Sequence, residues 1–183
     1  INELLHEGVI YAIPGKGLYV TAPKQDAEPL LRGFTEDMTQ RGMVPSSTLL
    51  AAEIVGASTV LSSALGVPIG TALVYLRRLR LADGAPVAVQ GSYLPQSLCP
   101  GLLKHDLARA SLFDLLRTVY RLRLADGTTT VEAALADAEH AKLLGLRLPA
   151  PLLIVEQLSY LDSGQAIEFV RSAYRADCYR LRV

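Results

Sequence analysis

Two arginines that stand two residues apart, Arg78 and Arg80, are the residues of this chain best suited to bind a ligand. They belong to an apolar-rich run that ends in Asp83-Gly84, a dipeptide typical of a two-residue hairpin turn. Side chains alternate between the faces of a strand, so both guanidiniums share a face with Val74 and Leu76. Guanidiniums offer fork-shaped donors to a phosphate or a carboxylate. The pattern predicts an anion-binding face, and a solvated outer face explains it equally well.

Two further polar residues could complete such a site. Ser111 has Asp114 three residues later, as in a capping box, which predicts a helix start where free N–H groups favour an anion. A plain cap explains Ser111 without any ligand. Glu168 lies in a second predicted strand, where its carboxylate could accept ligand hydroxyls or pair with Arg78 or Arg80. None of these residues is a strong base or nucleophile, so they favour binding over catalysis.

The strands that would carry these residues belong to an internal repeat. Gly66 matches Gly145 and Asp83 matches Asp162 at a spacing of 79 residues, which becomes 80 between Ser92 and Ser172. Each copy predicts a helix end, a proline-containing bend, a strand, a turn and a second strand. Two hairpins of one design therefore build one domain.

The rest of the chain predicts an α+β fold, a mostly antiparallel sheet with flanking helices. Helices are predicted over 30–41, 58–65, 111–120 and 137–144, and strands over 47–57, 73–82, 86–93, 128–136, 152–161, 166–175 and 177–183. Before these, residues 1–7 resemble the end of a helix and two short strands, 9–13 and 18–21, flank a tight basic tip. Residues 23–29 read as a polar linker.

Composition narrows the classes of function. The 183 residues are 50% hydrophobic and 20% charged with a net charge of zero, which argues against a nucleic-acid surface spread over the whole chain. The sequence has neither an apolar run long enough to span a membrane nor a secretory signal, so we expect a cytoplasmic protein. It has no Walker loop, dinucleotide fingerprint, nucleophile elbow or zinc signature. Cys99, Cys178 and the three histidines lack ligand spacing, so neither a metal nor a cofactor is expected.

Several segments, taken in order, resemble a known family. Residues 4–10 and 14–20 are similar to the end of the recognition helix and the wing of a GntR-type winged helix-turn-helix. The later segments resemble the UTRA effector-binding domain of the HutC subfamily: 34–38 with 41–42, 78–84, 92–95, 111–116 and 174–179. The resemblance implies a chorismate-lyase-like fold, a homodimer, and a bacterial transcription regulator, usually a repressor, whose DNA affinity changes when it binds a small metabolite.

The resemblance also implies a domain division. Residues 1–22 would be the C-terminal remnant of the winged helix-turn-helix, 23–29 a linker and 30–183 the UTRA domain. Lys16 on the wing would be a DNA contact. Since we expect only the tail of the DNA-binding domain here, operator DNA would be bound by the full-length protein alone.

Family members that bind phosphorylated sugars suggest a role for individual residues. The matching positions around the phosphate are Arg78, Arg80, Ser111 and Phe113; those around the sugar are Gln90, Glu168 and Tyr174; and Phe34 and Thr35 lie on the loop over the site. Many members have Glu in place of Gln90 and Tyr in place of Phe113. A glutamine donates as well as accepts, so the ligand's hydroxyl pattern could differ. Phe113 lacks a phenol, which leaves a carboxylate or another anion open.

The prediction is thus a ligand-sensing and dimerisation domain that binds a small anionic metabolite. The enzyme alternative is a chorismate-lyase-like activity, because the fold is shared and an arginine-lined pocket suits a dicarboxylate. The wing-like start argues against it. A third alternative, a dimerisation module without ligand, would be favoured if internal carboxylates fully occupied Arg78 and Arg80.

Overall fold

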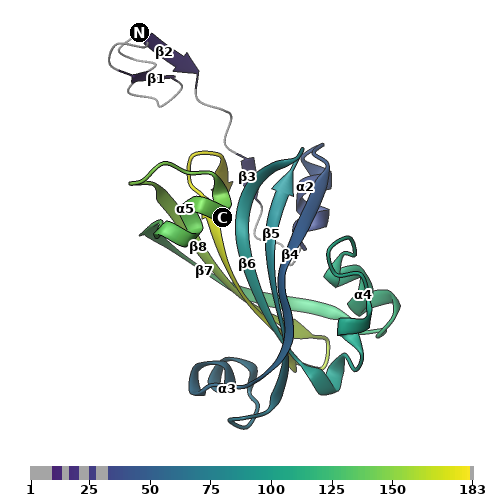
Figure 1. Ribbon diagram of the computed structural model, residues 1–183. Coiled ribbons are helices and arrows are strands. Elements are labelled where there is room, and N and C mark those ends of the chain that lie inside the picture. Colours follow the sequence, from purple (N-terminus) through teal and green to yellow (C-terminus); the bar gives the residue numbers. More distant parts are fainter. Residues whose placement is uncertain (1–9, 14–16, 21–24, 28–32, 182–183) are drawn as a thin grey trace.

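The structure is a computed structural model that describes the backbone of residues 10–13, 17–20, 25–27 and 33–181, and the side chains of 33–180. Its main feature is a six-stranded antiparallel sheet in the order β4-β5-β6-β9-β8-β7 (Figure 1). The strands are β4 (Pro45–Gly56), β5 (Ala72–Ala82), β6 (Ala85–Pro95), β7 (Leu124–Leu135), β8 (Pro151–Leu161) and β9 (Ala166–Arg175). The predicted fold class is confirmed.

The sheet is built from two copies of one unit. Each unit is a strand, a helix and a hairpin: β4, α3 (Thr59–Leu65), β5 and β6, then β7, α5 (Ala138–Leu144), β8 and β9. Both helices end at a glycine in the left-handed region, Gly66 with φ 64° and Gly145 with φ 66°. Left-handed C-caps favour glycine because it has no Cβ. The repeat seen in the hairpins therefore extends to the preceding strand and helix, and the two units meet where β6 pairs with β9.

The hairpin turns follow the local sequence. Asp83 and Gly84 both have positive φ, 51° and 79°, as a two-residue turn between twisted strands requires. The Asp83 carboxylate accepts a hydrogen bond from the Val44 N–H at 2.8 Å, which ties this turn to the start of β4. Capping side chains begin two of the helices: Ser58 and Asp137 accept from backbone N–H groups at the starts of α3 and α5.

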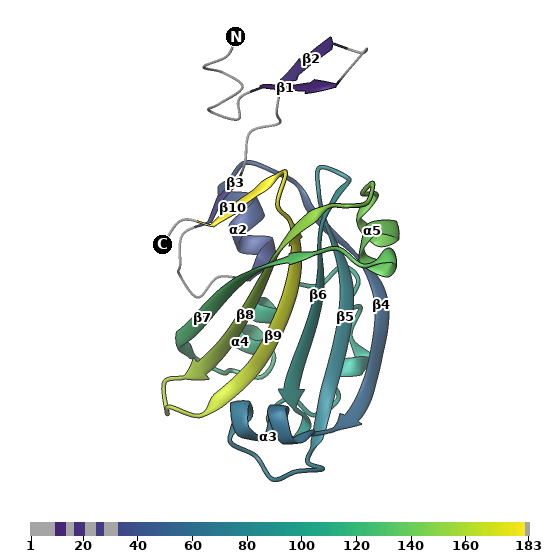
Figure 2. The same ribbon diagram turned by 90° about the vertical axis from the view of Figure 1, so that its left-hand side faces the viewer.

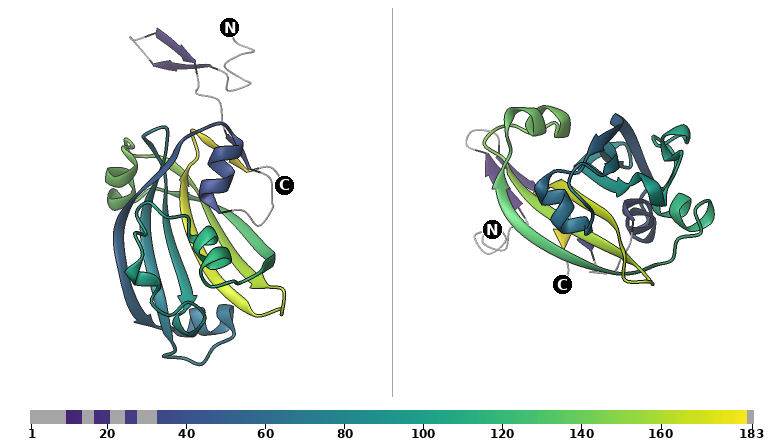
Figure 3. Two further views of the ribbon diagram at one scale, coloured as in Figure 1. Left: turned by 90° about the vertical axis from the view of Figure 1, so that its right-hand side faces the viewer. Right: turned by 90° about the horizontal axis from the view of Figure 1, so that it is seen from below.

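Different helices cover the two faces of the sheet (Figures 2 and 3). Helices α2 (Phe34–Gln40) and α4 (Leu112–Thr118) pack on the face that carries Arg78 and Arg80, which we call the arginine face. Helices α3 and α5 pack at opposite ends of the other face, the groove face. Two short 3-10 helices, Gln96–Leu98 and Leu102–Lys104, lead from β6 towards α4.

Two small sheets lie near the chain ends. Strands β1 (Ile10–Ile13) and β2 (Gly17–Val20) pair antiparallel, close to the two short strands predicted at 9–13 and 18–21. Strand β3 (Gln25–Ala27) pairs in parallel with β10 (Tyr179–Leu181). Thus a strand lies within the segment 23–29 that was predicted to be a linker. The helix end predicted over 1–7, and Lys16, lie outside the described residues.

Several element boundaries differ from prediction, and three of them have a local cause. Helix α4 ends at Thr118, not at Tyr120, because the chain reverses at Arg121, which has a φ of 56°. Strand β7 begins at Leu124, four residues early, because its first residues already pair with the end of β8. The last strand begins at Tyr179 because a turn precedes it. No helix among the described residues is long and apolar enough to cross a membrane.

Candidate anion-binding site

Arg78 and Arg80 lie side by side on the arginine face, and each is only 3% exposed. Val74, Leu76 and Ala82, on the same face of β5, are equally buried. The alternation predicted from sequence is therefore correct, and the solvated outer face is wrong. Helices α2 and α4 pack over this part of the sheet and exclude water from the two guanidiniums.

The two guanidiniums are poorly satisfied. Arg78 Nη2 donates to Gln90 Oε1 at 3.4 Å, and Gln90 Nε2 donates to Ser172 Oγ at 3.2 Å. Three buried nitrogens, Nε and Nη1 of Arg78 and Nε of Arg80, have no hydrogen-bond partner. Among the described side chains, neither arginine forms an ion pair with a carboxylate. An unsatisfied buried donor costs roughly 1–3 kcal/mol, and more if charged, so a hydrogen-bond acceptor placed at these nitrogens would stabilise them.

Burial also perturbs the ionisation of the site. It lowers the pKa of Arg78, and it lowers the pKa of Arg80 further because the charge of Arg78 adds to the desolvation. Burial raises the pKa of the Glu168 carboxyl, against the opposing effects of Ser92, Arg78 and Arg80. Two cations thus face a single carboxyl, and the site is positively charged when its groups are ionised.

Aromatic side chains enclose the arginines. The Phe34 ring at the start of α2 lies 4.2 Å from Arg80 Cζ, in a cation–π contact. Phe113, the second residue of α4, is 6% exposed and packs so closely on Gly33 that a Cβ there would lie 3.3 Å from the ring. Tyr174 on β9 is buried on the arginine face, across β6 from Arg80. These contacts bring α2, α4 and the sheet together around the guanidiniums.

Two predicted site residues form local hydrogen bonds. Ser111 Oγ accepts from the Asp114 N–H at 3.3 Å, so it caps α4 as its sequence context indicates. The Thr35 carbonyl accepts from the Thr39 hydroxyl at 2.8 Å within α2. Neither is joined to Arg78 or Arg80 by a hydrogen bond among the described residues.

Some residues of the site were missed from the sequence. Ser172 continues the Arg78–Gln90 hydrogen-bond chain, and Ser92 lies beside Glu168; both serines are almost fully buried. The signal for both was present, because Ser92 and Ser172 are equivalent positions of the repeat. Their equivalence places one serine from each unit on the arginine face.

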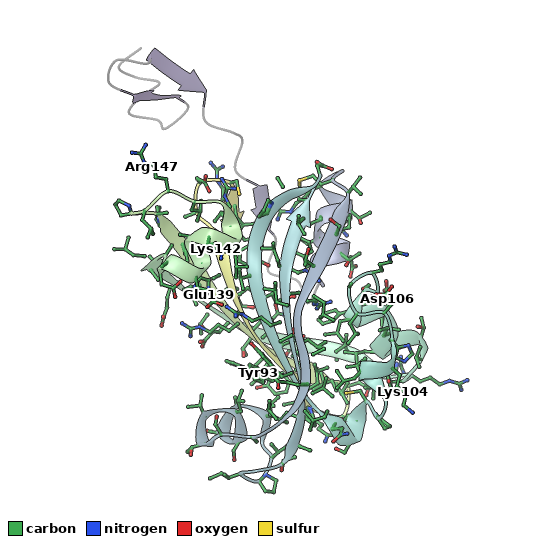
Figure 4. All side chains as sticks on the ribbon, viewed as in Figure 1. Tyr93, Lys104, Asp106, Glu139, Lys142 and Arg147 are labelled. Carbon is green, nitrogen blue, oxygen red and sulfur yellow. The ribbon has the colours of Figure 1, made fainter. Side chains whose placement is uncertain are left out.

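The groove face has a different character. A groove of about 440 Å³ lies between α3 and α5, with Tyr75, Gly91, Tyr93 and Phe169 among its lining residues. The Tyr75 and Tyr93 rings stack at 4.7 Å, and Tyr75 lies against Gly91, where a Cβ would be 3.4 Å from the ring. Figure 4 marks Tyr93 on the sheet and Glu139 on α5, which lie toward different ends of this face.

The arginines of this groove are paired. Arg77 Nη1 donates to Glu139 Oε1 at 2.6 Å, and Arg171 pairs with Glu156. The hydrogen bond to Glu139 raises the pKa of Arg77 and lowers the pKa of Glu139. Both of these arginines thus have a carboxylate partner, unlike Arg78 and Arg80.

Known proteins share both the sequence and this architecture. A family model described as UTRA domain matches residues 40–180. The HTH-type transcriptional repressor NagR of Bacillus subtilis (strain 168) is 32% identical over 180 residues, which cover 98% of this chain and 74% of that protein. The repressor PhnF of Mycolicibacterium smegmatis is 33% identical over 180 residues, covering 97% of this chain and 72% of that one.

Solved structures agree. The crystal structure of PhnF from Mycobacterium smegmatis superposes with a TM-score of 0.83 at 30% identity, covering 99% of this chain and 80% of that chain. The structure of its effector domain gives a TM-score of 0.81 at 29% identity, covering 86% and 96%.

Fold and relatives together define a ligand-binding domain of a transcriptional regulator. The chain belongs to the UTRA domain family of the GntR-type regulators. Because its relatives are transcriptional repressors and regulator effector domains, the chain is not an enzyme, and the lyase alternative is not favoured.

Proposed function

We propose that this chain senses a small anionic metabolite, a phosphorylated sugar being one class that fits, and that Arg78 and Arg80 hold its negative charge. The observation that carries the proposal is that Arg78 and Arg80, side by side on one strand, have between them three buried guanidinium nitrogens without a hydrogen-bond partner among the described residues. Buried donors of this kind are rare in stable folds, because a hydrophobic side chain of similar size would be better tolerated. Their retention fits a site that an anion completes.

The rest of the ligand would be bound by neutral and weakly acidic groups. Gln90, Glu168 and Tyr174 lie on β6 and β9 next to the arginines and offer both donors and acceptors to hydroxyls. Gln90 has a further consequence, since a carboxylate at that position would neutralise Arg78. With an amide there, the charge of Arg78 stays available, which favours a ligand with a full negative charge.

The aromatic and helical walls would complete the pocket. In this proposal Phe34 and Thr35 at the start of α2 and Ser111 and Phe113 at the start of α4 flank the anion. Phe113 contributes an apolar wall and no donor, so the guanidiniums carry most of the recognition. The dimerisation module without ligand is less favourable, because internal carboxylates do not occupy Arg78 or Arg80 among the described residues.

Regulation would follow from the rest of the protein. We infer a HutC-type arrangement in which 1–22 is the remnant of a winged helix, with Lys16 on its wing, 23–29 is the linker and 30–183 is the effector domain. Effector binding would favour one arrangement of two subunits and so space the DNA-binding domains well or badly for two half-sites. Since operator DNA lies in the cytoplasm, we expect the protein to act there.

A homodimer is part of the proposal. Both edge strands, β4 and β7, are 12 residues long and pair on one side only within the described sheet. They expose Leu49, Ile54 and Val131 by 37%, 42% and 41%. Long apolar edges are usually covered by a partner. Sedimentation should give about twice the 19.7 kDa chain mass, and a clean monomer at micromolar concentration would count against this part of the proposal.

The test of the ligand class is a thermal-shift screen of phosphorylated sugars and organic acids, followed by calorimetry. We expect at least one anion to bind the chain with Arg78 and Arg80 intact. Uncharged sugars matched to each anion are the control and should bind far more weakly. If uncharged sugars bound as well as their phosphates, the anion site would be wrong.

A further inference from the structure

The effector site and the strand that precedes it in the chain are connected through Tyr179. Strand β10 pairs in parallel with β3, with Tyr179 opposite Gln25 and Arg180 opposite Asp26. Strand β3 is the described segment between the β1–β2 hairpin and α2. A backbone ladder therefore joins β10 to a segment that lies between the β1–β2 hairpin and α2 in the chain.

The first connection to the site runs through Tyr174. The Tyr179 ring stacks on the Tyr174 ring with centroids 3.9 Å apart and an interplanar angle of 17°. Both tyrosines are buried, and Tyr174 lies on the arginine face close enough to Arg80 for each to affect the other's pKa. Tyr174 therefore contacts the site on one side and β10 on the other.

The second connection runs through α2. Its first residue, Phe34, lies over Arg80 at 4.2 Å. At its other end Arg41 bonds to Asp37 at 2.9 Å and lies over the Tyr179 ring at 5.5 Å. One short helix thus touches the anion site at its start and β10 at its end.

Resting on the proposed function, we propose that Tyr179 couples occupancy of the arginine site to the pairing of β3 with β10. An anion that fills the open positions on Arg78 and Arg80 fixes Arg80 and so orders Phe34 and Tyr174, its two aromatic neighbours. Phe34, Tyr174 and Tyr179 belong to one buried cluster. Ordering the first two therefore restricts the motion of Tyr179 and of β10, so the β3–β10 ladder opens less often in the bound state. The ligand in this way acts on the segment that leads to the hairpin.

Hydrogen exchange measures this coupling directly. Peptides that cover β3 and β10 are followed in the full chain with saturating inorganic phosphate or glucose 6-phosphate, and with sodium chloride at equal ionic strength. Coupling between sites usually amounts to a factor of about 5 or more, so we expect exchange in both strands to slow by at least that factor. Unchanged exchange in the presence of measured binding overturns the coupling and leaves the anion site standing. If neither of these anions binds, the same comparison is made with the tightest anion of the screen, and absence of binding by every anion overturns both.

Substitutions test the role of Tyr179 itself. Tyr179→Leu should abolish the slowing, and Tyr179→Phe should restore it because the stacked ring is kept. Tyr160→Leu removes a half-buried tyrosine from the cluster around α3 on the groove face and should leave the slowing intact. Full slowing in Tyr179→Leu contradicts the proposal.

A second variant avoids the core, in case Tyr179→Leu does not fold. Asp26→Pro disrupts the three-residue β3 ladder, because proline fixes φ and lacks the N–H donor. Linkage is reciprocal, so this change should weaken phosphate binding by the same factor by which phosphate slows exchange in the ladder. Asp26→Ala keeps the backbone and should bind as the unmodified chain does. Equal affinities for Asp26→Pro and Asp26→Ala overturn the coupling.

Discussion

Arg77 and Arg78 are neighbours on β5, and the alternation of the strand gives them opposite surroundings. Arg77, on the groove face, is 26% exposed at its side chain and is bonded to Glu139. Arg78, on the arginine face, is 3% exposed and has two nitrogens without a partner. The same residue type is thus electrostatically satisfied on one face and unsatisfied on the other. On this strand, the unpaired donors are what distinguish the arginines of the proposed site from the paired Arg77.

The largest difference between the faces should appear in ligand affinity. Arg78→Ala or Arg80→Ala removes a charge-assisted hydrogen bond to the anion, a loss of about 1.5–3 kcal/mol, or roughly ten- to a hundred-fold in affinity. Calorimetry with the tightest anion from the screen measures it. Arg80→Lys should recover part of the affinity, because it keeps the charge and loses the fork.

Arg77→Ala is the matched control on the same strand, and it should bind nearly as the unmodified chain does. If Arg77→Ala lost affinity while Arg78→Ala and Arg80→Ala kept it, the site would lie on the groove face.

Replacing Arg80 should raise the stability of the ligand-free protein, although it lowers the affinity for the ligand. Arg80→Met replaces a desolvated, poorly bonded guanidinium beside another cation with an apolar chain of similar length. Exchanges of this type are often neutral or stabilising, and we expect about 1 kcal/mol of added stability in urea unfolding. Arg77→Met breaks the bond to Glu139 and should destabilise slightly. A large loss of stability in Arg80→Met would show that Arg80 is satisfied in the free protein and that its open donor is not a ligand position.

Much of the fold could be predicted because its signals are local. Period-two alternation fixed which side chains of β5 share a face, and Asp83-Gly84 fixed the turn. The repeat placed the second hairpin, since Ser92 and Ser172 are equivalent. All of these depend on residues close in sequence or on a direct match between two segments.

The remaining features depend on contacts between distant segments. The pairing of β3 with β10 joins segments that are far apart in the sequence, and the residues of neither strand predict a three-residue parallel ladder. The stacking of Tyr174 on Tyr179 and the position of Arg41 over Tyr179 depend on how α2 packs on the sheet. The burial of Arg78 and Arg80 could not be predicted from the sequence of the strand alone, because it depends on helices α2 and α4, which pack over this face and exclude water.

The pKa values of Glu168 on the arginine face and Glu139 on the groove face are shifted in opposite directions, so the two carboxyls should change the pH dependence of stability with opposite signs. Burial raises the pKa of Glu168 above its ordinary value. The folded protein therefore holds this proton more tightly than the unfolded chain does, and stability decreases as the pH rises from the unfolded pKa to the folded one. Glu168→Gln should reduce that decrease, measured as urea unfolding at several pH values between 4 and 7. A difference between variant and unmodified chain that does not change with pH would mean that Glu168 is ionised to the same extent in both states.

Glu139 on the groove face should show the smallest effect, with the reverse sign. The hydrogen bond from Arg77 lowers the pKa of Glu139 below its ordinary value, so the unfolded chain holds the proton more tightly. The stabilisation from this pair is present above the unfolded pKa and is lost as the pH falls through the folded one. Glu139→Gln should therefore lower stability at pH 7 and converge with the unmodified chain in acid, and added salt should shrink the difference because the pair is exposed. A Glu139→Gln variant that was more stable than the unmodified chain at pH 7, the pattern expected for a carboxyl whose pKa is raised by burial, would show that the two faces are electrostatically alike and that the contrast between paired and unpaired arginines does not hold.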